Sequence, residues 1–181
     1  GRTAAFDDDG TFTGDLGTFT VTVANTKTMT VAANKVAGKT INKVGGGDGA
    51  LAVKLVSTAD DGAVDLTTVG GTATQTFEVT GNVTFSGTLH GSIATTIADS
   101  FTLTVAFNKV NGKTVNHDGS ESGQALLVTI ASADAAADLN NITSNITNLT
   151  AKFTQTQTFT GNLRTKTAAV DNGVTVTATA A

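Results

Sequence analysis

Apolar and polar residues alternate one by one along much of the chain. The clearest alternating runs, in which Thr separates Val, Leu, Met or Phe, are Phe19–Val23, Thr28–Val31, Phe101–Val105 and Val174–Thr177. Successive side chains of a β-strand point to opposite faces, so these runs predict strands with one apolar face and one threonine-rich face. Half-buried strands of this kind are typical of antiparallel sheets. The pattern therefore predicts a mainly β protein with an antiparallel β-sandwich or jelly-roll-like body.

Glycine marks turns between these runs. Ala37-Gly38 and Asn111-Gly112 each lie between two alternating runs. Asn-Gly is favoured in the tight turns of β-hairpins, where φ is positive. The chain contains no Pro, which is compatible with extensive strand pairing because Pro donates no hydrogen bond to a ladder. We therefore expect hairpins at both positions.

One segment has a helical period. Its apolar residues are spaced 3, 4, 3 and 4 positions apart, at Leu139, Ile142, Ile146, Leu149 and Phe153. A cap at Ser132 or Asp134 and the alanines that follow favour a helix, whereas the Asn and Thr residues between the apolar positions disfavour one. The spacing predicts one short helix over roughly 134–150.

The chain contains an internal repeat of about 74 residues. Residues 30–42 recur as residues 104–116, with ten of the thirteen positions identical. A second marker, Thr-Phe-Thr/Ser-Gly, begins at Thr11, Thr84 and Thr158, and so keeps nearly the same period. A fixed period of this length indicates duplicated architecture, in which each unit buries its apolar face against the next.

The phase of the repeat predicts the organisation of the chain. We expect an N-terminal arm over residues 1–16 and a single β-rich domain over residues 17–181, with units at about 11–83 and 84–157 and a partial unit at 158–181. A partial unit leaves an apolar face uncovered. Completion within one chain gives a closed globule, and completion by a neighbouring chain gives a polymer.

Composition narrows the class of protein. Charged residues make up 14% of the chain, well below the usual quarter, and Thr occupies 37 positions. The net charge is −4 and the basic residues are scattered, which argues against nucleic-acid binding. The sequence has no apolar run long enough to span a membrane, and the absence of Cys excludes disulfides and thiolate sites.

Two groups of residues match catalytic or nucleotide-binding motifs only in part. Gly38-Lys39-Thr40 lacks the preceding Gly of a phosphate-binding loop, because Ala33 stands at that position. Residues 117–122 contain the His, Asp and Ser of a hydrolase triad, but they lie in one short loop, and the first repeat has Lys43 in place of His117. We therefore expect no catalytic residues, no cofactor and no enzyme activity.

Calcium and glycans are the ligands that single segments suggest. Asp7, Asp8 and Asp9 are candidates for Ca²⁺, which prefers clustered carboxylates, although their spacing fits no calcium loop and a solvated acidic turn is the favoured interpretation. Four Asn residues lie in Asn-x-Ser/Thr sequons: Asn82, Asn141, Asn145 and Asn148. They accept glycans only in an exported protein, and the last three share one face of the expected helix.

The overall composition resembles that of a class of secreted proteins. Low charge, no Cys, abundant Thr, Gly, Ala and Asn, and short alternating strands look like the surface-layer, matrix and filament proteins of bacteria and archaea. The resemblance implies export to the cell surface or the extracellular space. It also implies self-assembly, with copies of the chain as partners.

These observations favour a structural subunit of an extracellular filament or surface array that assembles by strand exchange, as in donor-strand complementation. We expect the N-terminal arm, with Phe6 and Phe12 as apolar plugs, and the C-terminal strand, with Val174 and Val176, to take part. The alternative is a secreted adhesin that binds carbohydrate or a surface, with or without Ca²⁺. The lack of Trp and Tyr weighs against carbohydrate stacking. Interrupted Thr rows weigh against a threonine-faced ice-binding protein.

Overall fold

The chain winds in successive coils, each of which contributes two short strands. The structure is a computed structural model that describes residues 2–119, 123–164 and 166–178. The first strands of the coils have odd numbers: β1 (Thr3–Phe6), β3 (Thr20–Val23), β5 (Ile41–Lys43), β7 (Thr74–Val79), β9 (Thr95–Ile97), β11 (Val115–His117), β13 (Leu149–Phe153) and β15 (Thr167–Val170). The second strands have even numbers: β2 (Gly10–Phe12), β4 (Thr28–Ala32), β6 (Ala50–Leu55), β8 (Val83–Phe85), β10 (Thr102–Ala106), β12 (Ala125–Ile130), β14 (Gln157–Phe159) and β16 (Val176–Ala178). Coil 1 thus contains β1 and β2, and coil 8 contains β15 and β16.

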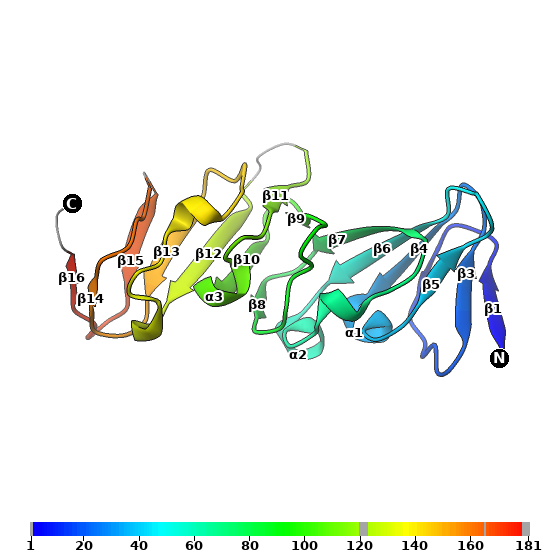
Figure 1. The fold of residues 1–181 in the computed structure, drawn as a ribbon, viewed down its shortest axis with the longest axis horizontal. Coiled ribbons are helices and arrows are strands. Elements are labelled where there is room, and N and C mark those ends of the chain that lie inside the picture. The colour runs from blue at the N-terminus through cyan, green and yellow to red at the C-terminus, as the bar shows by residue number, and fades with distance from the viewer. Residues whose placement is uncertain (1, 120–122, 165, 179–181) are drawn as a thin grey trace.

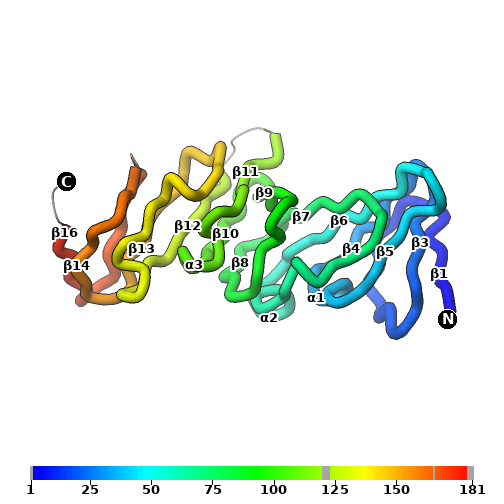
Figure 2. The backbone as a smooth tube through the Cα atoms, viewed as in Figure 1, coloured from blue at the N-terminus to red at the C-terminus, as the bar shows by residue number. Residues whose placement is uncertain are grey.

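Each described strand pairs in parallel with a strand one coil away. Thr3 lies opposite Thr20 at the start of the chain, and Leu51 lies opposite Gln75 further along, so the length of a coil varies. The coils stack along the long axis of the molecule, with β1 at one end and β16 at the other (Figures 1 and 2). This arrangement is a parallel β-helix, or β-solenoid.

A third side closes each coil. It carries the one-turn helices α1 (Ala33–Val36), α2 (Thr58–Asp61) and α3 (Phe107–Val110), and the 3₁₀ turns η1 (Leu66–Thr68), η2 (Ser132–Asp134) and η3 (Leu139–Asn141). Ser57 caps the N-terminus of α2, because its hydroxyl accepts a hydrogen bond from the Asp60 amide at 3.1 Å. Coils 2, 3, 5 and 6 therefore have two sides of strand and a third side of short helical turns, whereas the third side of coils 1, 4 and 7 is irregular.

Equivalent strands of successive repeat units lie in different sheets. The described strands form four parallel sheets, ordered β1-β3-β5, β2-β4-β6-β7-β9-β11, β8-β10-β12-β13-β15 and β14-β16. The first unit comprises β1 to β6, the second β7 to β12, and the partial third β13 to β16. The second strands of one unit therefore continue as the first strands of the next, through the pairs β6–β7 and β12–β13. Each unit is thus rotated about the long axis by one side of the coil relative to the unit before it.

The core is a continuous column inside the coils. Inward residues of neighbouring coils stack in register, as in the row Phe12, Val31, Val53, Phe77, Thr95 and Val115 of the second sheet. Neighbouring strands are about 4.8 Å apart, which brings stacked side chains into contact along the axis. A coil therefore buries its apolar side chains only when another coil lies on each side of it.

The structure confirms a mainly β protein, but the predicted antiparallel β-sandwich or jelly-roll is wrong, because all sheets of the described residues are parallel. An alternating pattern records that one face of a strand is buried, and it carries no information on the direction of the partner. Parallel sheets are usually covered on both faces. In this solenoid they keep one solvent face, and so they show the alternation that is typical of antiparallel sheets.

The two expected hairpins are not formed by the described residues. Gly38 and Gly112 do have positive φ, 71° and 72°, as a tight turn requires. Each follows a one-turn helix, however, and the strand after it pairs with the first strand of the preceding coil, as β5 pairs with β3 and β11 with β9. The two turns are confirmed, and the role predicted for them is wrong.

The predicted helix over residues 134–150 is wrong. The segment contains part of η2, then η3, and it leads into β13. All five apolar residues of the helical stripe are at most 2% exposed, so their burial agrees with the prediction. The corners of a coil turn a side chain inward every three or four residues, which gives helical spacing without a helix.

Candidate assembly surfaces at the two end coils

Residues 3–12, which the sequence predicts as part of an N-terminal arm over residues 1–16, form coil 1 of the solenoid. β1 and β2 are edge strands, because β1 pairs only with β3 and β2 only with β4 among the described strands. Phe6 and Phe12 pack edge to face, with ring centroids 5.7 Å apart and planes at 79°. Both side chains are half-buried. The outer side of this aromatic pair is uncovered.

An equivalent aromatic pair in the third unit is covered. Phe153 and Phe159 hold the positions of Phe6 and Phe12 two units later in the chain. Their ring centroids are 5.1 Å apart with planes at 80°, and they are only 2% and 4% exposed. The two pairs share their geometry, so the difference in burial comes from the coil stacked on one pair and missing from the other.

The described residues leave coil 8 uncovered in the same way at the opposite end. Val170 of β15 occupies the inward position that Val23 and Ile97 occupy in earlier units. It is 50% exposed, whereas Val23 and Ile97 are fully buried. Sequence reasoning missed this exposed valine, although aligning the three units would have found it.

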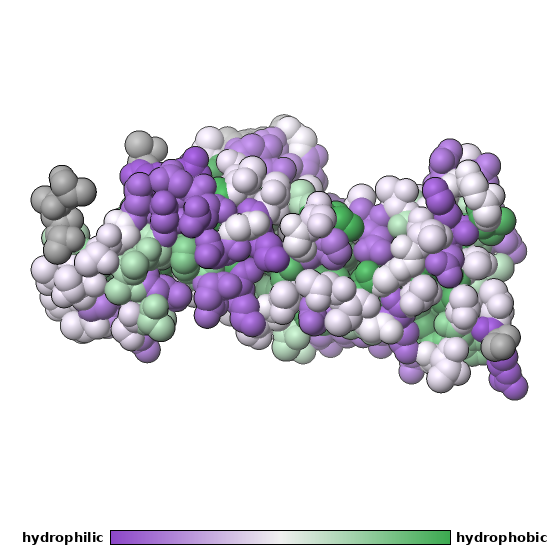
Figure 3. Space-filling model, in the orientation of Figure 1, coloured by the Kyte–Doolittle hydropathy of each residue, from purple (hydrophilic) through white to green (hydrophobic). Residues whose placement is uncertain are grey.

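The second strand of coil 8 shows the same contrast. Val176 is half-buried, while Met29 and Leu103 at the equivalent positions are fully buried. Val174 also packs partly against the core. The residues predicted for assembly, Phe6, Phe12, Val174 and Val176, therefore lie in the two terminal coils. Figure 3 shows apolar surface reaching the outside at the N-terminal end of the rod.

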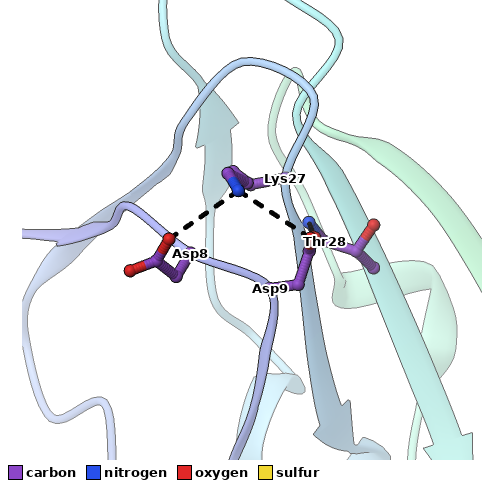
Figure 4. Close-up of polar contacts among 4 residues, drawn as sticks. All are labelled: Asp8, Asp9, Lys27 and Thr28. Carbon is purple, nitrogen blue, oxygen red and sulfur yellow. Dashed lines mark hydrogen bonds and ion pairs between the residues drawn. The ribbon is translucent and has the colours of Figure 1, made fainter.

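The acidic turn at Asp7–Asp9 connects the two strands of coil 1. The Thr28 amide donates to Asp9 Oδ1 at 2.6 Å, and Lys27 Nζ lies 3.7 Å from Asp8 Oδ1 and 3.9 Å from Asp9 Oδ2 (Figure 4). The ammonium group of Lys27 thus supplies positive charge to these two carboxylates. No cluster of three or more His, Asp or Glu side chains suited to a metal ion occurs in the part of the chain that the structure describes.

The corner bond made by Asp9 recurs in each unit. Asn82 Oδ1 accepts the Thr102 amide at 2.9 Å, and Thr156 Oγ1 accepts the Thr175 amide at 3.1 Å. The three acceptors differ chemically but lie at equivalent positions of successive units. A side-chain oxygen at this corner is therefore a repeated device that joins one coil to the next.

The four sequon asparagines are exposed, but three of them also join coils. Besides Asn82, Asn145 Oδ1 accepts the His117 amide at 2.9 Å, and Asn148 Nδ2 donates to the Gln124 carbonyl at 3.4 Å. The fourth, Asn141, is the last residue of η3. Because the expected helix does not form, Asn141, Asn145 and Asn148 do not make the stripe that its face would have given.

Both histidines stabilise corners. His90 Nδ1 accepts the Ile93 amide at 3.1 Å, and its ring stacks on Phe77 with centroids 5.6 Å apart. His117 Nδ1 accepts the Gly119 amide at 3.3 Å. The serines considered with it for a hydrolase triad, Ser120 and Ser122, lie outside the described residues.

Two lysines also link neighbouring coils. Lys39, from the incomplete phosphate-loop motif, donates its ammonium to the Gly17 carbonyl at 2.5 Å. Lys54 of β6 forms an ion pair with Glu78 of β7, directly across the first unit boundary. Burial lowers the pKa of Lys54, and the Asp118 carboxylate partly offsets this effect.

A cavity of about 460 Å³ lies beside α1 and α2. It is lined mainly by Thr11–Thr13, Thr30–Ala32, Asn34, Lys35, Lys54, Val56, Asp60 and Asp61. Asp61 is fully buried and accepts the Val56 amide at 2.8 Å and the Asn34 amide at 3.0 Å, so it holds the helical side of the coil together. The lining residues include neither His nor Cys.

Among the residues described here, the helices span single turns, and none has the length and apolar character needed to cross a bilayer. Comparison with known proteins finds no matching family model, no matching curated protein and no matching solved structure.

Proposed function

We propose that this chain is a structural element of an extracellular filament or surface array, and that it assembles end to end through its outermost coils. The observation that carries the proposal is that the described residues leave inward positions of coils 1 and 8 exposed or half-buried. Phe12 is half-buried and Val170 is exposed, although both face inward. The equivalent residues of the other units are buried. A further coil of the same kind would cover Phe12 and Val170.

Edge pairing and apolar burial would drive this assembly together. Among the described strands, β1, β2, β15 and β16 each have a partner on one side only. An exposed strand edge offers a row of backbone donors and acceptors to another strand. Covering apolar surface contributes about 25 cal/mol per Å². Whole coils would therefore add to the rod without opening its interior.

The extracellular, non-catalytic role is supported by composition and shape. Low charge, no Cys and abundant Thr suit an exported structural protein, and the elongated stack of coils suits a spacer or filament segment (Figure 1). A threonine-faced ice-binding surface would need a regular outward array. The outward row Thr84, Thr104, Leu127, Thr150 and Thr167 of the third sheet is interrupted by a leucine.

The test compares two lysine substitutions in β15 of the whole chain. Val170→Lys places a charge at the inward, exposed position of coil 8, and Thr167→Lys places the same charge on the outer face of the same strand. Sedimentation velocity and negative-stain electron microscopy over a range of concentrations should show end-to-end association of the parent chain and of Thr167→Lys. Val170→Lys should remain monomeric, because burying an unpaired charge is costly.

Equal association of the two variants would show that the C-terminal core surface is not used. Parent chains that stay monomeric at all concentrations would refute assembly through the end coils. Circular dichroism of each variant confirms that the solenoid has folded, since Lys at a half-exposed position is tolerated without a neighbouring coil.

A further inference from the structure

We infer that the outer edge of coil 1 is a docking site for one type of coil, namely the coil that closes a repeat unit, built as coils 3 and 6 are. This inference rests on the proposed function and specifies the partner that the outer edge of coil 1 accepts. The partner is a coil with a β6-like strand followed by a turn like the one at residues 62–64.

The chain contains two examples of this interface. Coils 4 and 7 open the second and third units, and each lies on the coil that closes the unit before it. β7 pairs with β6 and β13 with β12 in parallel register. The backbone amides just after β8 donate hydrogen bonds to carbonyls in the turn at residues 62–64. Those just after β14 donate to carbonyls in the turn at residues 135–137. Coil 1 opens the first unit, and no described coil lies on its outer side.

A glycine marks the closest approach in both examples. A Cβ atom on Gly87 would overlap the carbonyl oxygen of Val64, and one on Gly161 would overlap that of Ala137. Such close approach excludes a side chain. Gly14 holds the same position in coil 1, where the nearest atom to its Cβ would belong to the ring of Phe12, at 2.9 Å. Coil 1 therefore carries the glycine of an interface that the described residues leave empty.

A backbone donor repeats the pattern. The amide of Thr88 donates to the Val64 carbonyl at 3.2 Å, and the amide of Asn162 donates to the Ala137 carbonyl at 2.9 Å. Asp15 is the equivalent residue of coil 1, and its amide meets no carbonyl of the described residues. Gly14 and the Asp15 amide thus correspond to the groups through which coils 4 and 7 contact this turn.

Coil 8 is of a different type. β15 and β16 correspond to β3 and β4, with Val176 at the position of Met29 and Ala178 at the position of Val31. The turn at residues 62–64 comes later in the unit, after β6 and α2. An unchanged second copy would therefore offer coil 1 a coil that never precedes a unit-opening coil inside this chain. Residues 32–73 are the part of a unit that supplies the fitting coil.

The experiment extends the chain by that part. Residues 32–73 are added directly after Ala178, which gives three complete units. Because each unit advances by one side of a three-sided coil, three units also bring the last coil back to the starting side. We expect the extended chain to associate end to end at a concentration at least about tenfold lower than the parent chain does, measured by sedimentation velocity.

The matched control is the extended chain with Gly14→Val. The three atoms nearest to a Cβ at this position all belong to the Phe12 ring, which can shift, so the variant should fold as its parent does. In the interface, the added side chain would meet the backbone of the docked turn. Association of the Gly14→Val chain should return to the level of the unextended parent.

A second measurement works within one molecule. Residues 76–149 are placed directly before Thr3, so that a unit-closing coil precedes coil 1 as it precedes coil 7. Hydrogen exchange of the Gly14 and Asp15 amides should slow at least about tenfold. Placing only residues 76–113 before Thr3 puts a coil of the β3–β4 type, with its third side, there, and exchange should stay fast.

The outcomes separate the two proposals. If the extended and parent chains associate equally well, or if both fusions protect Gly14 and Asp15 equally, coil 1 does not select its partner, while assembly through the end coils stands. If no chain associates at any concentration, the proposed function fails. If only the residue 76–149 fusion protects the two amides, the selectivity of coil 1 is established even where the extended chain does not fold.

Discussion

Coils 1 and 4 carry the same marker but have different neighbours. Phe12 and Phe85 each follow a Thr and precede Thr-Gly or Ser-Gly. Phe85 is 2% exposed, whereas Phe12 is half-buried. In a solenoid, burial is thus set by the neighbouring coils, and stability is close to a sum of coil-to-coil interfaces. The same residue therefore has two different energetic roles, which matched substitutions can measure.

The largest expected effect comes from removing the marker phenylalanine. Phe85→Ala should lower the free energy of unfolding by about 3–5 kcal/mol, because it leaves a cavity between two coils. Phe12→Ala should cost only about 1 kcal/mol, since this ring is only half-buried. Urea unfolding followed by circular dichroism, at concentrations where the chain is monomeric, measures both. Equal losses would contradict the contrast between the end coil and the inner coil.

The marker glycines give the next test. Gly87→Ala should destabilise the chain by at least about 2 kcal/mol, because the added methyl group would overlap the Val64 carbonyl and force the two coils apart. Gly14→Ala should change stability by no more than about 0.5 kcal/mol, since the Phe12 ring can shift. Thermal unfolding measured by calorimetry compares the two. A large loss in Gly14→Ala would mean that the glycine serves the folding of coil 1 itself.

The smallest expected effect is a pH dependence of stability that arises at one of the two unit boundaries. Lys54 faces Glu78 across the first boundary, and Thr129 faces Lys152 across the second. Since burial holds the pKa of Lys54 below its ordinary value of 10.5, the folded chain loses this proton at a lower pH than the unfolded chain. Unfolding then takes up a proton between the lowered pKa and 10.5, so stability should rise slightly with pH in that window.

Lys54→Arg keeps the charge and removes the titration in this range. The difference in unfolding free energy between the parent and Lys54→Arg should therefore change as pH approaches 10.5. Parallel curves for the two chains would show that the environment of Lys54 does not alter its pKa.

The candidate assembly surfaces were predicted in part from the sequence. The sequence predicted Phe6, Phe12, Val174 and Val176, because apolar residues in an incomplete unit lack a partner. Val170 and Gly14 were missed, because an alternating valine and a turn glycine are unremarkable in this chain. Their meaning depends on equivalents such as Val23 and Gly87, whose burial and close contacts only the structure shows.

The sequence by itself determined which strand positions face inward, where glycine turns occur and how long the repeat is. These properties are local or periodic: a side chain points inward on every second strand residue, and Gly38 permits a positive φ wherever the chain goes next. Only the tertiary structure decided the direction of pairing and the advance by one side per unit. The partner of each strand lies a full coil away in the sequence, as Thr20 does from Thr3, and alternation with period 2 is the same for a parallel and an antiparallel partner.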